Sequence, residues 1–213
     1  MFLFYRSFFL KNIDIKRFFT SYPHLWIIGL IYLITANGHI EIADTEYSIR
    51  TALSIVENGT LLIRPPDITA VQNFPKIENL DKIYSPYGIG LSLIFIPFVI
   101  TSKLLAWLTG IELRLILDFI LSFYNIPFAI LGLYFFQNIT LQLGASTKKS
   151  IFMTVVLGVG TCFWKYSVTD FSEISQSCLI LGIFYTILKR NKNIWQNLSF
   201  YYSCLLLIKL TYF

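Results

Sequence analysis

Long stretches without a charged side chain are the feature that most limits what this sequence can fold into. Thr20–Ile40 and Ile83–Ser102 contain no Asp, Glu, Lys or Arg, and Leu115–Ser146 contains only Asp118. A helix of about 20 apolar residues crosses the roughly 30 Å hydrocarbon core of a bilayer. Only 14% of all residues are charged, whereas soluble domains contain about 25%. The sequence therefore predicts an all-α, polytopic membrane protein.

Three shorter apolar runs follow, at Ser150–Trp164, Ile174–Leu188 and Asn193–Ile208. The formal net charge of +5 does not indicate nucleic-acid binding, because the basic residues are scattered among these runs and form no stripe. The three cysteines lie within apolar runs and lack the spacing of metal ligands. We therefore expect the apolar runs to contact membrane lipids.

Basic residues give the chain an orientation. Residues 1–19 carry Arg and Lys among aromatic side chains, which is typical of an interfacial segment on a cytoplasmic membrane face. Thr20–Ile40 is then the first span and leads outward. A cleaved signal peptide is the alternative, since "LITANGH" offers small residues near a cleavage point, but the full-length apolar run favours a retained span.

The basic pairs further along restrict the number of crossings. Residues 41–114 form the first outer loop, whereas Lys148–Lys149 and Lys189–Lys192 are typical of cytoplasmic loops. Both basic pairs end on the cytoplasmic side only if Ile83–Ser102 does not cross the membrane. This segment is interrupted by two prolines and two glycines, so we expect a re-entrant or surface helix that returns to the outer face. Residues 115–213 then supply the remaining spans. We expect one membrane domain, residues 1–213, with about five spans.

An amphipathic helix is expected inside the outer loop. Apolar residues recur from Asp44 to Val56 at helical spacing, and Asn58-Gly59 is a typical helix stop. Asp44 suits the N-cap of this helix. It could also act with a second outer-face acid, Asp170 or Glu173, in proton abstraction or metal binding.

Several segments resemble, in order, the polytopic GT-C glycosyltransferases, especially bacterial relatives of protein mannosyltransferases and aminoarabinose transferases. They are "ADTEYSIRTALSIVENGTLLI", "KIYSPYGIGLSLIFIPF", "TGIELRLILDF" and "TCFWKYSVTDFSEISQSCLILGIF". The resemblance implies transfer of a sugar, with inversion, from a polyprenyl-phosphate donor to a lipid, glycan or protein acceptor. It also implies an active site on the outer face of a bacterial inner membrane.

Carried over to this sequence, the family's first-loop catalytic acid matches Asp44, and its second acidic position matches Glu173, although Asp is commoner there. The resemblance thus implies that Asp44 and Glu173 are catalytic and, if the reaction uses a divalent metal ion, hold it. No other cofactor is indicated.

Four further residues are candidates for substrate binding. Arg114 and Lys165 could neutralise the donor phosphate, and Tyr84 and Tyr87 could line a sugar pocket. Each has an alternative. Arg114 can form an i,i+4 ion pair with Asp118, the lysine can reach from a span toward water, and tyrosines often anchor helices at membrane interfaces.

Members of this family usually continue through further spans, whereas this sequence stops at "LLLIKLTYF", so we expect it to be the N-terminal part of a longer transferase. Two other classes remain open. A non-catalytic membrane scaffold would use Asp44 only as a cap. A transporter would show paired broken helices in two related halves, and only one broken segment is present.

Overall fold

The computed structural model describes residues 20–40, 42–63, 84–189 and 194–209. The fold of this part is all-helical, as predicted. Its helices, in chain order, are α3 (Pro23–Thr35), α4 (Ala43–Asn58), α5 (Ile89–Thr109), α6 (Leu113–Leu121), α7 (Asn125–Gln142), α8 (Thr147–Gly160), α9 (Cys162–Ser167), α10 (Glu173–Lys189) and α11 (Ile194–Lys209). The predicted interfacial segment, residues 1–19, lies outside the described residues.

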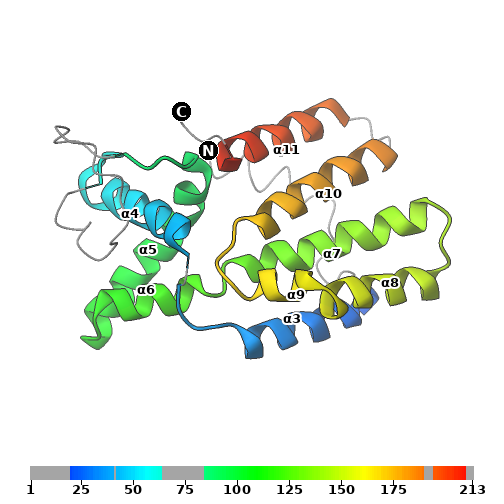
Figure 1. Ribbon diagram of the computed structural model, residues 1–213, viewed down its shortest axis with the longest axis horizontal. Helices are drawn as coiled ribbons and strands as arrows, with labels where there is room; N and C mark the ends of the chain where they lie inside the picture. The colour runs from blue at the N-terminus through cyan, green and yellow to red at the C-terminus, as the bar shows by residue number, and fades with distance from the viewer. Residues whose placement is uncertain (1–19, 41, 64–83, 190–193, 210–213) are drawn as a thin grey trace.

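Five helices, α3, α7, α8, α10 and α11, lie side by side as a bundle (Figure 1). Their direction alternates: α7 and α10 run toward one end, and α3, α8 and α11 run back. Thr35, Asn125 and Glu173 therefore lie toward one end, and Thr147 and Lys189 lie toward the other. This alternation is the order of helix directions that the basic residues predicted.

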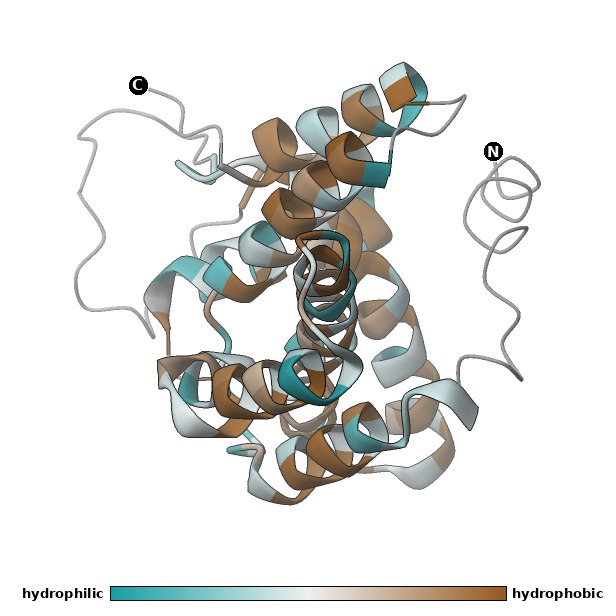
Figure 2. Cartoon of the chain, turned by 90° about the vertical axis from the view of Figure 1, so that its right-hand side faces the viewer, coloured by the Kyte–Doolittle hydropathy of each residue, from teal (hydrophilic) through white to brown (hydrophobic). Residues whose placement is uncertain are grey.

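Many side chains on the outside of the molecule are apolar. Figure 2 shows brown, apolar residues along much of the helical surface, and Trp107 and Trp195 are 79% and 78% exposed. Exposed threonines on these helices bond to their own backbone: Thr35 Oγ1 donates to Ile31 O, and Thr101 Oγ1 donates to Pro97 O. Such internal pairing removes the need for water, which a lipid-facing surface lacks.

Two helical segments are long and apolar enough to cross a membrane by length and composition. They are Ile89–Thr109, and Leu113–Gln142 counted through the short turn between α6 and α7. The first predicted span is shorter than expected, because α3 has 13 residues. It ends at Thr35, since Ala36 is extended and Gly38 has a φ of 74°.

Of the predicted interruptions of Ile83–Ser102, those at Gly90 and Pro97 are wrong, and the re-entrant or surface position of the helix stays a prediction. Pro86 and Gly88 precede α5, and the helix then continues without a break past Gly90 and Pro97. Gly90 is needed for packing: a Cβ there would lie 2.7 Å from the backbone carbon of Leu207 in α11. The glycine therefore allows the α5 and α11 backbones to approach closely. The residues next to Gly90 in the sequence gave no sign of this contact.

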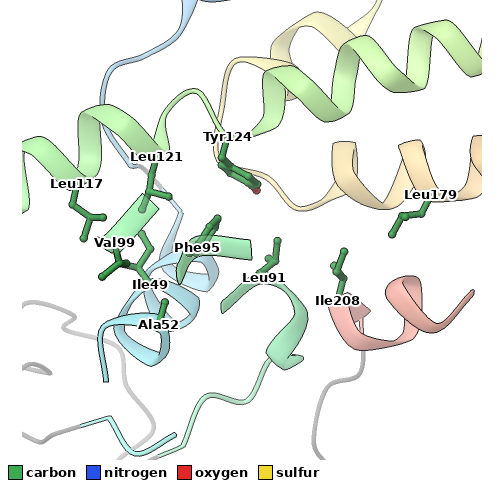
Figure 3. Close-up of a cluster of buried hydrophobic side chains, with 10 residues drawn as sticks. All are labelled: Ile49, Ala52, Leu91, Phe95, Val99, Leu117, Leu121, Tyr124, Leu179 and Ile208. Atoms are coloured by element: carbon green, nitrogen blue, oxygen red, sulfur yellow. The ribbon is translucent and has the colours of Figure 1, made fainter. Parts of the chain in front are cut away.

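Helices α4, α5 and α6 gather beyond one end of the bundle (Figure 1). A buried cluster shown in Figure 3 joins them to α7: Ile49 of α4, Phe95 of α5, Leu117 of α6 and Tyr124 of the turn before α7 meet there. The Phe95 and Tyr124 rings pack edge to face, 4.9 Å between centroids. The amphipathic helix predicted from Asp44 to Val56 is confirmed, and its apolar face makes this contact.

Candidate functional site

Asp44 lies in the first turn of α4 but does not cap it. The N-cap is Ile42, and no side chain caps the helix there, so the interpretation of Asp44 as an N-cap is wrong. Asp44 is exposed, and the Tyr87 hydroxyl donates a hydrogen bond of 2.5 Å to its Oδ1. The Tyr47 ring packs edge to face on the Tyr87 ring. A predicted catalytic acid and a predicted substrate-binding tyrosine are therefore in direct contact.

The tyrosine remains a proton donor over the ordinary pH range. Burial, and then the hydrogen bond to Asp44 and the charge of this carboxylate, raise the pKa of Tyr87 to about 12. Burial and the charge of Asp44 also raise the pKa of Tyr47 above its usual value. Because both phenols stay neutral, they add no negative charge beside Asp44, and the contact fixes the carboxylate through Oδ1.

The predicted tyrosines line one pocket. Its volume is about 340 Å³, within the range of about 300 to 1,000 Å³ that small-ligand sites occupy. Tyr84 is 57% exposed, and Tyr87 links the pocket to Asp44. The lining residues are Thr51, Leu61, Tyr84, Ser85, Tyr87, Ile89 and Ser92. This mostly apolar pocket with hydroxyl groups at its wall suits the face of a sugar ring or a lipid chain.

A second acid reaches α4, and it is Asp170. Its Oδ2 accepts a hydrogen bond of 2.9 Å from the Ile42 N–H, and its backbone carbonyl accepts one of 2.7 Å from Thr45 Oγ1. Asp170 is 1% exposed. Glu173, the predicted partner of Asp44, is exposed at the start of α10, three residues further on. The loop before α10 therefore approaches the start of α4 through Asp170.

The start of α7 anchors this loop. Asn125 Nδ2 donates to the carbonyls of Thr169 and Phe171, both at 2.7 Å, and the Tyr124 hydroxyl donates to the carbonyl of Asp170 at 3.1 Å. Asn125 is fully buried. Residues from α7, the loop and α4 thus form one hydrogen-bonded chain that fixes the position of Asp44.

Glu46 belongs to a separate cluster of charges, the Glu46 network (Glu46, Arg50, Arg114 and Asp118). Two residues turn a helix by about 200°, so Glu46 and Asp44 point to different sides of α4. Glu46 accepts two hydrogen bonds from Arg114, at 2.8 and 2.7 Å, and one of 2.7 Å from Arg50. Arg114 also donates to Asp118 at 2.8 Å, which confirms the expected i,i+4 pair.

This network keeps Glu46 ionised. Burial alone would raise the pKa of Glu46, but the hydrogen bonds and charges of Arg114 and Arg50 outweigh burial and hold it below the usual value. All three guanidinium nitrogens of Arg114 are engaged by Glu46 and Asp118. These bonds use three of the five N–H groups of the arginine, so a donor phosphate would share its positive charge with two carboxylates.

Lys165, the other predicted phosphate-binding residue, is exposed in the last turn of α9. The described part of the chain contains no group of three or more His, Cys, Asp and Glu side chains that could hold a metal ion. A metal at Asp44 and Glu173 remains a prediction.

Local sequence spacing indicated part of the Glu46 network. It did not indicate whether Asp170 or Glu173 contacts α4. Glu46 and Arg50, like Arg114 and Asp118, are spaced i,i+4, which favours ion pairs on a helix. The pairing of Glu46 with Arg114 links residues 68 positions apart, which no local pattern predicts. Asp170 and Glu173 were both candidates from sequence, and only the fold shows which one contacts α4.

Comparisons of this chain with known protein families, with curated proteins and with solved structures found no match.

Proposed function

We propose that this protein is a membrane glycosyltransferase. It transfers a sugar from a polyprenyl-phosphate donor to a lipid, glycan or protein acceptor, with inversion at the anomeric carbon. The observation that carries the proposal is the contact of Asp44 with Tyr87 at the wall of a 340 Å³ pocket. That pocket lies in the helical group beyond one end of an apolar bundle, where a lipid-linked donor and a polar acceptor can meet.

Asp44 is the general base of the proposed reaction. The acceptor oxygen bonds to the anomeric carbon while the bond from this carbon to the donor phosphate oxygen breaks. The acceptor proton passes to Asp44, and the polyprenyl phosphate leaves with the electron pair of the broken bond. Tyr87 holds Oδ1 of Asp44, so that Oδ2 faces the acceptor. Positioned bases contribute about 10²- to 10⁴-fold to such reactions.

Tyr84 and Tyr87 hold the sugar in this proposal, and Asp170 is a positioning residue that fixes the start of α4. Lys165 is exposed in α9, and its neighbour Trp164 donates a hydrogen bond to Thr35 at the end of α3 that leads to α4. In this proposal the lysine supplies positive charge toward the departing phosphate. Glu173, exposed at the start of α10, is the second acid of this proposal. No step is assigned to a metal ion, because the described donor set lacks a third ligand.

We further propose that α3, α7, α8, α10 and α11 each cross the bacterial inner membrane and that the end bearing Asp44 faces outward. The alternating directions of these helices support this topology, as do the lysines at the opposite end. Helix α5 packs against α4, α6 and α11 and is long enough to cross a membrane. We place it at the outer surface, with its exposed apolar face in lipid, because the end of α3 and the start of α7 lie at the same end of the bundle.

Donor turnover tests the proposal. The protein is reconstituted in vesicles with a panel of polyprenyl-phosphate-linked mannose, glucose, galactose and aminoarabinose, together with bacterial envelope lipids and glycans as acceptors. Release of polyprenyl phosphate is measured. Asp44→Asn should lower the rate by about 10²-fold or more, as expected for loss of a general base. The control is Glu112→Gln, which removes an exposed carboxylate outside the site.

Equal rates for Asp44→Asn and the wild-type protein would contradict the assignment of Asp44. Absence of turnover with every donor would instead favour the non-catalytic membrane scaffold.

A further inference from the structure

A second pocket lies on the other side of α4 from Asp44. Its volume is about 250 Å³, just below the range of about 300 to 1,000 Å³ for drug-sized ligands, so it suits a group of about one ring. The pocket runs along one face of α4, from its first turn to its end, beside the start of α6. The lining residues are Glu46, Arg50, Leu53, Ser54, Glu57, Asn58, Leu113 and Arg114.

The charged groups around this pocket balance. Glu46 and Asp118 face Arg50 and Arg114, and Lys103 pairs with Glu57 at 2.6 Å. Three carboxylates thus meet three cations. A strongly charged ligand gains no net attraction here, and it would compete with ion pairs that already exist. A neutral ligand with several hydroxyl groups avoids this cost.

The pocket still offers a hydrogen-bond donor and a hydrogen-bond acceptor. Arg50 uses Nε for Glu46, and among the described residues its Nη1 has no hydrogen-bond partner although the side chain is only 10% exposed. Glu57 is engaged by Lys103 through Oε1, which leaves acceptor capacity at its other oxygen. A hydroxyl both donates and accepts, so adjacent hydroxyls of a sugar can pair with a guanidinium and a carboxylate together.

We infer that this pocket binds a sugar residue of an acceptor glycan at a position beyond the reacting sugar. The inference rests on the proposed function. Arg50 follows Asp44 by six residues, about 9 Å along the helix, and points to another face. Glu46, which also lines the pocket, is turned about 200° from Asp44 around α4. The body of α4 therefore separates the pocket from Asp44, and the pocket cannot hold the reacting hydroxyl. The single sugar of the donor lies at the reacting centre. The sugar in this second pocket therefore belongs to the acceptor, which must contain at least two sugar residues.

Binding of free disaccharides tests the inference without any donor. The protein in lipid nanodiscs is titrated with maltose, cellobiose, chitobiose and mannobiose, and saturation-transfer NMR reports binding. Leu113→Trp fills the pocket from the α6 side without removing a polar group, and it should abolish the signal. Arg50→Gln should weaken binding roughly tenfold, as expected for loss of a charged hydrogen bond. Glu112→Gln is the control and should bind as the wild-type protein does.

The outcomes separate this inference from the proposed function. Disaccharide binding that Leu113→Trp abolishes supports the pocket even if no donor is turned over. Donor turnover without disaccharide binding, or binding unaffected by both variants, overturns it. Inorganic phosphate is titrated in parallel, and phosphate binding without disaccharide binding would identify an anion site and also overturn the inference. Thermal unfolding of each variant verifies that it is folded.

Discussion

At the level of single residues, the contact between Tyr87 and Asp44 defines the candidate site. The hydroxyl donates to a carboxylate oxygen that is exposed to solvent, so the bond orients Asp44 without burying it. Both residues were predicted from sequence, one as a catalytic acid and the other as a sugar-binding tyrosine. Their direct contact was not predicted, because they lie 43 residues apart and no local pattern connects them.

Replacing Tyr87 by Phe removes this hydrogen bond and keeps the ring. A base that loses its orientation keeps only part of the about 10²- to 10⁴-fold that a positioned base contributes, so we expect donor turnover to fall by roughly tenfold. The melting temperature should fall by only a few degrees, because the bond lies at an exposed position. Tyr202→Phe, at an exposed position of α11, is the matched control. An unchanged turnover rate in Tyr87→Phe would show that the contact does not orient the base.

Acidification should expose the role of Glu46. Its pKa in the folded protein lies below the usual value, so its contribution to stability is complete above the unfolded-state pKa of about 4.3 and is lost as pH falls through the folded pKa. We expect the free energy of unfolding to fall below about pH 4.3 and to fall less steeply in Glu46→Gln. Chemical denaturation in detergent at several pH values measures this difference. Parallel pH profiles for the two proteins would contradict it.

At the level of elements, the loop between α9 and α10 determines where α4 begins. Asn125 at the start of α7 holds the carbonyls of Thr169 and Phe171, and Asp170 in turn holds the N–H of Ile42. Hydrophobic periodicity predicted α4 well, because a half-buried helix shows its pattern locally. The choice between Asp170 and Glu173 could not be predicted, since it depends on how three distant segments pack.

Asn125→Ala should disconnect this chain of hydrogen bonds. It removes the side-chain donor from the buried bond to Thr169 and from the partly buried bond to Phe171, at a cost of about 2 kcal/mol in the free energy of unfolding. We also expect faster hydrogen exchange at the Ile42 amide, because Asp170 loses its anchored position. Exchange measured by mass spectrometry provides the readout, and Asn138→Ala, on the same helix, is the control. Unchanged exchange at Ile42 would contradict the proposed coupling.

Helix α5 shows where local sequence rules gave the wrong prediction. Its glycines and prolines indicated a broken segment, yet α5 is continuous past Gly90 and Pro97. Gly90 lies against the α11 backbone, where a Cβ would not fit. The same residue type weakens a helix in isolation and allows close helix packing in a fold. Only the position of α11, more than a hundred residues later, distinguishes these two roles.

At the level of the whole molecule, the order of helix directions follows from the distribution of charge. Basic pairs predicted that Lys148 and Lys189 would lie on one side, away from Asp44. The start of α8 and the end of α10 do lie at the same end of the bundle, away from α4 (Figure 1). The lengths of the individual helices were less predictable. Helix α3 is shorter than its apolar run, since the backbone becomes extended at Ala36 and left-handed at Gly38.

The most direct test of the account is the side of the membrane on which each end of the bundle lies. Cys162, Cys178 and Cys204 are first replaced by Ala, and single cysteines are introduced at positions 44, 173 and 148. Each variant is treated with a membrane-impermeant maleimide in right-side-out and in inverted vesicles. We predict that positions 44 and 173 react only from outside and that position 148 reacts only from inside. Labelling of positions 44 and 173 from opposite sides would contradict a shared outward-facing site.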